Sequence, residues 1–383
     1  MVSLFGLCDI LKYGYISNGV LEVQESFQLK LNKPDNNDDC MIVSLNACYV
    51  GDKAPTIKFC LLVSNSSQDN EMLYESHEYN IGSKEEFSIK EWRIPPMISA
   101  DIHAVIHVRI PDNTKLFVRD MHNTYSPAQV QWRCGIRHNA HLGFYGMAPN
   151  CTMPAFELAA KCGFPACIVV PKVTADGKLM CIHDDTINAT ARKKDGSEFD
   201  EDVYVSDTTY RELQEFDFGS CKNNFYKGTK MPLLEDFFAL CAKTGMRPMF
   251  STHPALSVEE WKKVKLMLKK YGLLKVFHIK SFSLEMLETA YSIFGDSIEG
   301  YTWDDGDVKK MKETAINPYK CRVGIELKFD SYTKEIVEEI IDAGFFAAAW
   351  KIGHRNMDEY RRVMSYGVTE FTEDYHCSMG LNW

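Results

Sequence analysis

The chain has 383 residues, of which 45% are hydrophobic and 25% are charged, a composition typical of globular proteins and unlike that of disordered or fibrous ones. It carries 43 basic and 53 acidic residues, and the resulting net charge of −10 disfavours DNA or RNA as a partner. A small phosphate compound is not excluded, because a pocket can be locally positive. No apolar run approaches the roughly 20 residues that a membrane-spanning helix needs.

The N-terminus has neither the basic segment nor the apolar core of a signal peptide. The 13 cysteines lie mostly in apolar stretches, such as Cys167 in ACIVV, and no CxxC pair occurs. This usage is typical of cysteine as a small core residue and indicates a reducing compartment. We therefore expect a cytoplasmic protein without a transmembrane segment. Nothing in the sequence decides its oligomeric state.

Residues 1–128 carry a β pattern almost free of helical periodicity. Turn-rich pieces such as NKPDNNDD (32–39) separate short runs in which apolar and polar residues alternate. Short strands at this spacing predict a β-sandwich-like domain, whose role the sequence does not reveal. The expected strands are 21–31, 40–50, 56–64, 85–92, 101–110 and 115–121.

Residues 129–383 change to strands that alternate with amphipathic helices, which predicts a parallel sheet. Eight such strands over this length predict an α/β fold, a (β/α)₈ TIM-type barrel. The expected strands are 134–141, 166–173, 178–183, 247–253, 275–282, 297–303, 345–352 and 368–374. The expected helices are 154–162, 233–243, 257–272, 283–294, 334–344 and 357–367. RVGIELKF (322–329) is an additional strand-like run, in which we expect Glu326 and Lys328 to face solvent.

Seven sequence blocks occur in order along this second region. The first is HLGFYGMAPNCTMPAF (141–156), which places His141 and Gly143 before Pro149, Thr152 and a helix that starts with Ala-Phe. The others are Gly163 with Thr174, Asp176 and Gly177; His183 with Asp184; residues 209–237; Ser281-Phe282; Trp350 in AAAWKIG; and GVTEFTED (367–374). Together they resemble the glycerophosphodiester phosphodiesterase family over about residues 137–378. The resemblance does not extend to the β region.

The resemblance implies that His141 and His183 act as general acid and base on a phosphodiester, at the mouth of the barrel. It also implies a divalent cation, Mg or Ca, held by three carboxylates. In this sequence those positions fall on Ile168, Val170 and about Ser251, none of which is a carboxylate. We therefore predict no metal site of the family type and no cofactor.

A phosphate group without a cation needs another positive charge nearby. The family's phosphate-clamping arginine falls on Leu142 and its Pro-Glu-Asn-Thr glutamate on Asn150. Lys172 shares a strand face with the former ligand positions and could place its ammonium there. The predicted substrate-binding residues are Lys172, His253, Lys280 and Trp350, with His138 as a further candidate and Asp374 as a residue that closes a turn.

Three functions remain open at this point. The first is a metal-independent enzyme of lipid metabolism that cleaves, cyclises or transfers a small glycerol-linked or sugar-linked phosphodiester. The second is a non-catalytic relative that acts as a binding module, because fold alone does not decide function. The third is an enzyme of altered chemistry in cell-surface polymer synthesis. Basic groups that converge on the two histidines would favour the first.

Overall fold

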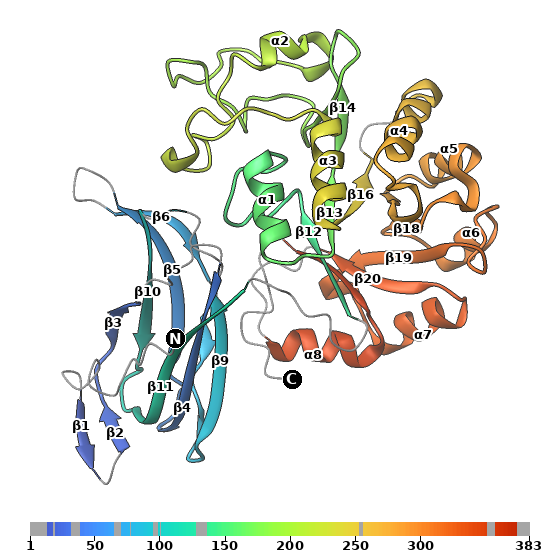
Figure 1. Ribbon diagram of the computed structural model, residues 1–383. Helices are drawn as coiled ribbons and strands as arrows, with labels where there is room; N and C mark the ends of the chain where they lie inside the picture. Colours follow the sequence, from blue (N-terminus) through green and yellow to red (C-terminus); the bar gives the residue numbers. More distant parts are fainter. Residues whose placement is uncertain are drawn as a thin grey trace. The chain divides into compact units, whose positions relative to one another are not determined.

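The computed structural model describes residues 14–17, 20–31, 39–64, 70–76, 78–94, 99, 101–127, 136–252, 256–350 and 357–373. These residues form two compact units (Figure 1). One contains the residues up to 127, and the other contains nearly all described residues from 136 onward. No helix within these ranges is long and apolar enough to cross a membrane.

The N-terminal unit consists of two mostly antiparallel sheets. In the described residues one sheet has the strand order β1-β2-β11-β4-β8, with β9 also paired to β4. The other has the order β3-β10-β5-β6, with β7 also paired to β5. The strands are β1 (Gly14–Ser17), β2 (Val20–Val23), β3 (Phe27–Lys30), β4 (Asp39–Val50), β5 (Thr56–Ser64), β6 (Asn70–Glu75), β7 (Tyr79–Asn80), β8 (Ser83–Lys84), β9 (Ser88–Ile94), β10 (Ile102–Arg109) and β11 (Lys115–Pro127).

Alternating side chains from both sheets form the core of this unit. Along β4 every second residue from Met41 to Ala47 is buried, as the period of a strand requires. Phe59 of one sheet lies 5.8 Å from Trp92 of the other, measured between ring centroids. The two sheets therefore pack face to face, and the predicted sandwich-like architecture is confirmed.

The second unit is a closed parallel barrel in the order β12-β13-β16-β17-β18-β19-β20-β21. The predicted TIM-type fold is confirmed. The barrel strands are β12 (Arg137–His141), β13 (Ala166–Val169), β16 (Arg247–Ser251), β17 (His278–Ser281), β18 (Gly300–Asp304), β19 (Arg322–Lys328), β20 (Phe346–Trp350) and β21 (Glu370–Glu373).

Two strand assignments made from sequence were wrong. Residues 178–183 do not form a barrel strand: β15 (Leu179–Cys181) pairs antiparallel with β14 (Pro171–Val173) in a separate hairpin. Only a short turn joins these two strands, whereas a parallel neighbour needs a crossover of a dozen or more residues. The eighth barrel strand is instead β19, which the sequence analysis treated as an additional strand-like run.

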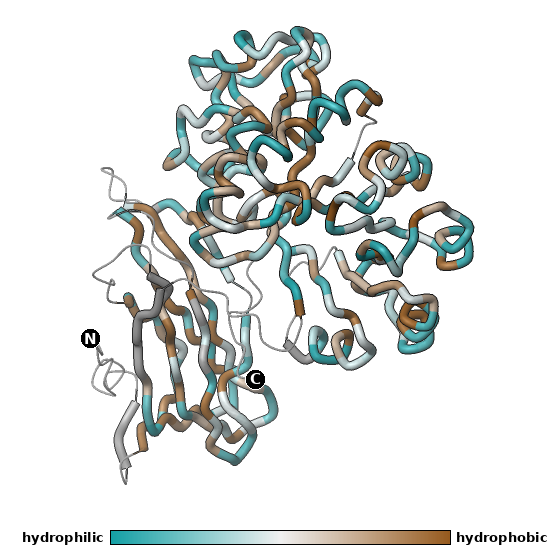
Figure 2. The backbone as a smooth tube through the Cα atoms, turned by 45° about the vertical axis from the view of Figure 1, so that its right-hand side comes forward, coloured by the Kyte–Doolittle hydropathy of each residue, from teal (hydrophilic) through white to brown (hydrophobic). Residues whose placement is uncertain are grey.

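The helices of the second unit are α1 (Met153–Lys161), α2 (Tyr210–Leu213), α3 (Leu234–Thr244), α4 (Val258–Lys270), α5 (Leu284–Phe294), α6 (Val308–Lys312), α7 (Lys334–Asp342) and α8 (Met357–Tyr366). They lie outside the barrel strands, most of them against the barrel, whereas the short α2 lies in the long segment between β15 and α3 (Figure 1). Figure 2 shows hydrophobic and hydrophilic residues alternating along these helices, as amphipathic outer helices require. The charged run in α4 fits this pattern, because Trp261, Val264 and Leu268 are its buried residues.

Charged side chains fill the amino-terminal end of the barrel. Arg137 Nη1 lies 2.6 Å from Glu299 Oε1, and Arg247 donates to the same oxygen. Arg322 Nη1 lies 2.8 Å from Glu370 Oε2. These pairs join residues on strands far apart in sequence and compensate charges that burial would otherwise penalise.

Glu299→Gln tests this network. Removing one carboxylate leaves two arginines under-compensated in a half-buried site, so we expect the free energy of unfolding to fall by about 3 kcal/mol. Urea denaturation followed by far-ultraviolet circular dichroism measures this change. The matched control is Glu235→Gln, whose partner Lys270 is exposed and whose loss should cost under about 1 kcal/mol. Equal effects in the two variants would contradict a structural role for the network.

Candidate active site

A hairpin brings the two predicted catalytic histidines together. β12 ends at His141, which pairs in register with Ile168 of β13. The chain then leaves the barrel as the β14–β15 hairpin, visible beyond the barrel strands in Figure 1. On the return, Ile182 N–H donates to Val170 O at 2.9 Å, which sets His183 beside the end of β13. The two imidazole centroids lie 6.4 Å apart with their planes nearly perpendicular.

The backbone after His141 is strained. Leu142 and Cys151 have positive φ values of 55° and 56°, and Cys151 N–H donates to Leu142 O at 2.9 Å. Gly143, with φ 89°, has no space for a side chain, because a Cβ there would lie 2.5 Å from the Cβ of Ala155. Such strain costs about 1–3 kcal/mol per residue and concentrates at functional sites. The turn is fixed against α1 by the hydrogen bond from Phe144 N–H to Ala155 O, and His141 lies directly before it at the barrel rim.

His183 is paired with an adjacent carboxylate. Its Nδ1 lies 2.7 Å from Asp184 Oδ1, and the two side chains are 42% and 41% exposed. A carboxylate only accepts hydrogen bonds, so Nδ1 is the protonated nitrogen. The neutral ring therefore presents Nε2 as its proton acceptor, which is the state that a general base requires.

Lys172 lies on the hairpin and not on the barrel strand, because β13 ends at Val169. Lys172 and Ile168 therefore lie on different strands and do not share the strand face that the sequence predicted. The Lys172 ammonium pairs with Asp185, and the lysine side chain is 6% exposed while its partner is 70% exposed. The pair therefore joins a buried ammonium to a carboxylate that faces solvent.

Lys280 is enclosed in the barrel interior. Its ammonium donates to Glu326 and lies 3.5 Å from Asp304 Oδ2, and all three side chains are buried. Glu326 Oε1 also accepts a hydrogen bond from Thr372 at 2.7 Å. The expectation that Glu326 faces solvent was wrong, because β19 is a barrel strand and directs this residue inward.

These contacts set the protonation of the cluster. Burial raises the pKa of Asp304 well above its usual value. Burial also opposes ionisation of Glu326, but the Lys280 ammonium and the hydrogen bonds outweigh it, so its pKa is lowered. Lys280 therefore lies between two buried carboxyls, with its ion pair to Glu326, and these contacts occupy its ammonium inside the barrel.

The barrel is similar to known proteins over most of its length. The sequence model of the glycerophosphoryl diester phosphodiesterase family matches residues 141–369. The chain belongs to this family. YhdW of Bacillus subtilis, a provisionally named glycerophosphodiester phosphodiesterase, is 36% identical over 239 residues, which are 62% of this chain and 93% of that protein.

Solved structures of the family share the fold. One is a phosphodiesterase from Oleispira antarctica in complex with the product sn-glycerol-3-phosphate. It is 20% identical to this chain with a TM-score of 0.53, and the match covers 62% of this chain and 93% of that protein chain. A glycerophosphodiester phosphodiesterase from Agrobacterium tumefaciens is 20% identical with a TM-score of 0.51, over 63% of this chain and 96% of its own.

The residues at the family's metal positions do not fit a cation. Ile168 and Val170 are buried apolar side chains, and Ser251 contributes only a hydroxyl. Hard divalent cations take several oxygen ligands, chiefly carboxylates. Across the described ranges, no three His, Cys, Asp or Glu side chains are grouped to hold a metal ion. Leu142, at the clamping-arginine position, is also buried and apolar.

Of four further predicted residues, two lie within the described part of the chain, in different surroundings. His138 is on the face of β12 opposite His141, where it bonds to Glu373 and stacks on Phe371 with centroids 5.6 Å apart. It therefore does not join the site. Trp350 ends β20 at the rim, and its Nε1–H donates to Asp305 at 3.3 Å. His253 and Asp374 lie outside the described residues.

Sequence reasoning missed Tyr145 and Lys222. The Tyr145 ring lies 6.5 Å from the His141 ring, and Lys222 Nζ lies 5.0 Å from the Tyr145 centroid. Lys222 also donates to the carbonyls of Tyr145 and Gly146 at 2.8 and 3.0 Å. No local pattern marks this lysine, because 76 residues separate it from the turn that it contacts.

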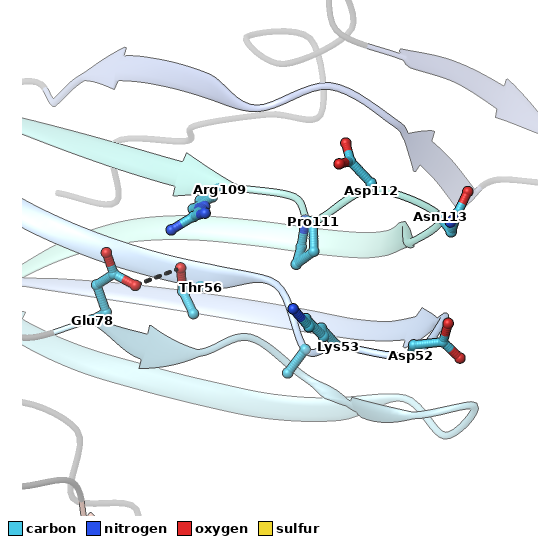
Figure 3. A pocket seen from close by; sticks show the side chains of 9 residues that line it. Asp52, Lys53, Thr56, Glu78, Arg109, Pro111, Asp112 and Asn113 are labelled. Carbon is cyan, nitrogen blue, oxygen red and sulfur yellow. Dashed lines mark hydrogen bonds between the residues drawn. The ribbon is translucent and has the colours of Figure 1, made fainter.

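The N-terminal unit has a cavity of its own, of about 520 Å³ (Figure 3). Cationic and anionic side chains both line it, with Arg109 and Lys53 near Glu78 and Asp112. Thr56 donates to Glu78 at 3.2 Å across one wall. The lining has two cationic and three anionic side chains and therefore no net positive charge for an isolated phosphate.

Lys280→Met tests whether the enclosed lysine is structural. The substitution leaves ionised Glu326 uncompensated in a buried interior, so we expect a loss of about 3–5 kcal/mol in the free energy of unfolding. The control Lys262→Met removes an exposed ammonium whose partner Glu259 is also exposed, and should cost under about 1 kcal/mol. Urea denaturation compares the two. A small loss in Lys280→Met would contradict the enclosed ion pair.

Asp304→Asn tests the raised pKa of this buried carboxyl. A carboxyl with a raised pKa in the folded state contributes stability at low pH that is lost as the pH rises from near 4, its unfolded value, toward its folded value. Asparagine lacks this titration, so the stability of the variant relative to the native chain should increase with pH. Urea midpoints at half-unit steps from pH 4 to 8 give the comparison. A difference that decreases with pH would mean that Asp304 is ionised.

Proposed function

We propose that this chain cleaves a small phosphodiester with His141 and His183 as acid and base, without a divalent cation. The observation that carries the proposal is the perpendicular pair of imidazoles 6.4 Å apart at the carboxyl end of the barrel. Active sites of TIM-type barrels lie at this end. Membership of the phosphodiesterase family supports the same reaction class.

The arrangement assigns one role to each ring. His183 Nε2 removes the proton from the attacking hydroxyl, while Asp184 on Nδ1 stabilises the imidazolium that forms. The oxygen of that hydroxyl bonds to phosphorus as the bond from phosphorus to the leaving oxygen breaks. His141, protonated at the start, gives its proton to the leaving oxygen. The products are an alcohol and a phosphate ester, cyclic when a neighbouring hydroxyl of the substrate attacks.

Negative charge on the nonbridging oxygens must meet a fixed positive charge. Lys172 is the proposed source. Its buried ammonium exchanges Asp185 for the phosphate oxygens when the substrate binds. Lys172 pairs with Met180 of β15, the strand that leads directly to His183, which supports this assignment.

A non-catalytic binding module remains the second candidate. Buried apolar residues at Leu142, Ile168 and Val170 favour it, since they remove the family's usual means of charge compensation. The pairing of His183 with Asp184 favours the enzyme, because a binding site has no need of an oriented proton acceptor.

Phosphorus-31 NMR of the purified chain with a panel of glycerophosphodiesters, with and without EDTA, tests the proposal. We expect turnover that resists EDTA and falls by about 10²–10⁴-fold in His141→Ala and in His183→Ala, because each removes one proton transfer. The product shift distinguishes a cyclic phosphate from a hydrolysed one. The control His107→Ala, in the N-terminal unit, should leave turnover unchanged.

Each opposite result has a definite meaning. Turnover abolished by EDTA would refute the metal-free mechanism, and turnover retained in His141→Ala would refute the role of that histidine. The absence of turnover on every substrate would favour the binding module.

A further inference from the structure

A lysine from a distant part of the chain contacts the turn that follows His141. Lys222 Nζ donates hydrogen bonds to the carbonyl oxygens of Tyr145 and Gly146 at 2.8 and 3.0 Å. The same ammonium lies 5.0 Å from the centroid of the Tyr145 ring, within the range of a cation–π contact. One side chain therefore contacts both the backbone and the aromatic ring of this turn.

Backbone hydrogen bonds fix the loop that carries this lysine. Lys222 N–H donates to Gly219 O at 2.9 Å, and Asp217 Oδ1 accepts a hydrogen bond from Gly219 N–H at 2.8 Å. Gly219 has no space for a side chain, because a Cβ there would lie 1.7 Å from Tyr226 O. Lys222 therefore extends from a closely packed loop, which suits it to hold another segment in place.

Tyr145 carries the contact to His141. The two rings lie 6.5 Å apart between centroids with their planes at 86°, an edge-to-face arrangement that aromatic rings favour. The His183 ring lies 6.4 Å from the His141 ring at 87°. Tyr145 is 39% exposed, so burial alone does not determine where its ring lies. The contacts from Lys222 supply a further constraint.

The orientation of the His141 ring matters for the reaction proposed above. An imidazole turns about its Cβ–Cγ bond in broad wells, and only some of these orientations direct a protonated nitrogen at the leaving oxygen. The perpendicular Tyr145 ring excludes part of this rotation. A displacement of about 1 Å in a reacting group can lower the rate by about 100-fold, so a modest loss of orientation is measurable.

The segment that carries Lys222 also carries the other histidine. His183 is the second residue after β15, and the chain from there to α3 includes both α2 and Lys222 (Figure 1). This excursion from the barrel therefore contains the proposed base near its start and a contact to the turn of the proposed acid farther along.

We propose that Lys222 is a positioning residue, which fixes this turn so that the Tyr145 ring holds His141 in the orientation for proton transfer. The inference rests on the proposed function, since it concerns the acid of that reaction. Lys222 acts here through Tyr145 and does not touch the reacting atoms. If the lysine only stabilised the fold, its removal would change stability and leave the His141 ring as it was.

NMR of the full chain with carbon-13-labelled histidine tests the contact without any turnover. We expect Lys222→Met to shift the Cε1–H resonance of His141 in the same direction as Tyr145→Leu, because both weaken the effect of the tyrosine ring. Lys222→Arg should restore the native position, because a guanidinium can also donate to two carbonyls. The matched control is Lys230→Met, which loses a 2.8 Å hydrogen bond to Phe216 O in the same segment and should leave the resonance unchanged.

Steady-state kinetics on a glycerophosphodiester tests the consequence for proton transfer. We expect kcat to fall about tenfold in Lys222→Met, with KM within about twofold of the native value, because the lysine orients a reacting group without contacting the substrate. Lys222→Arg should regain most of the lost kcat, and Lys230→Met should not change it. Circular dichroism at the assay temperature confirms that each variant is folded.

An unchanged His141 resonance in Lys222→Met, or an equal shift in Lys230→Met, would overturn the inference. A rise in KM at constant kcat would also overturn it, because Lys222 would then be a ligand of the substrate. Failure of the proposed function gives a different result. If the resonance shifts as expected while no diester is turned over, the hold on His141 stands and the catalytic proposal fails. If diesters are turned over with the same kcat in Lys222→Met, the positioning role alone fails.

Discussion

Closure of the parallel barrel is the constraint on which the rest of the structure depends. It directs alternate residues of eight strands into one shared interior, where each charge needs a partner. At the amino-terminal end Arg137 and Arg247 share Glu299, and nearer the carboxyl end Lys280 pairs with Glu326. These contacts join strands distant in sequence, so the barrel and its ion pairs form together.

The same closure determines which basic groups are available to a ligand. Lys280 points into the interior and is neutralised there, whereas Lys172 leaves the barrel on the hairpin and faces a solvated partner. Ile168 and Val170 stand where the family has metal-binding carboxylates. The buried ammonium of Lys172 lies on the hairpin that leads to His183.

Much of the site followed from local sequence. The blocks around His141 and His183 identified both histidines and placed His141 at a strand end, followed by a turn whose geometry depends on neighbouring residues such as Gly143. The hairpin that carries His183 was predicted as a barrel strand instead. The role of Lys280 could not be predicted, because it depends on Glu326, 46 residues away. Glu326 was placed in solvent for the same reason: alternation shows two faces of a strand but not which one is enclosed. No local sequence pattern marked Lys222 as a residue of the site.

By itself the sequence determined the β-sandwich-like region, the barrel class, most helices and the two histidines of a phosphodiesterase family member. These depend on periodicity and short-range spacing, which the chain carries locally. Only the tertiary structure decided that β15 leaves the barrel, that β19 enters it, and which lysines remain available to a ligand. These outcomes depend on long-range pairing and on the free energy of buried charge, which emerges only when the strands close around a common interior.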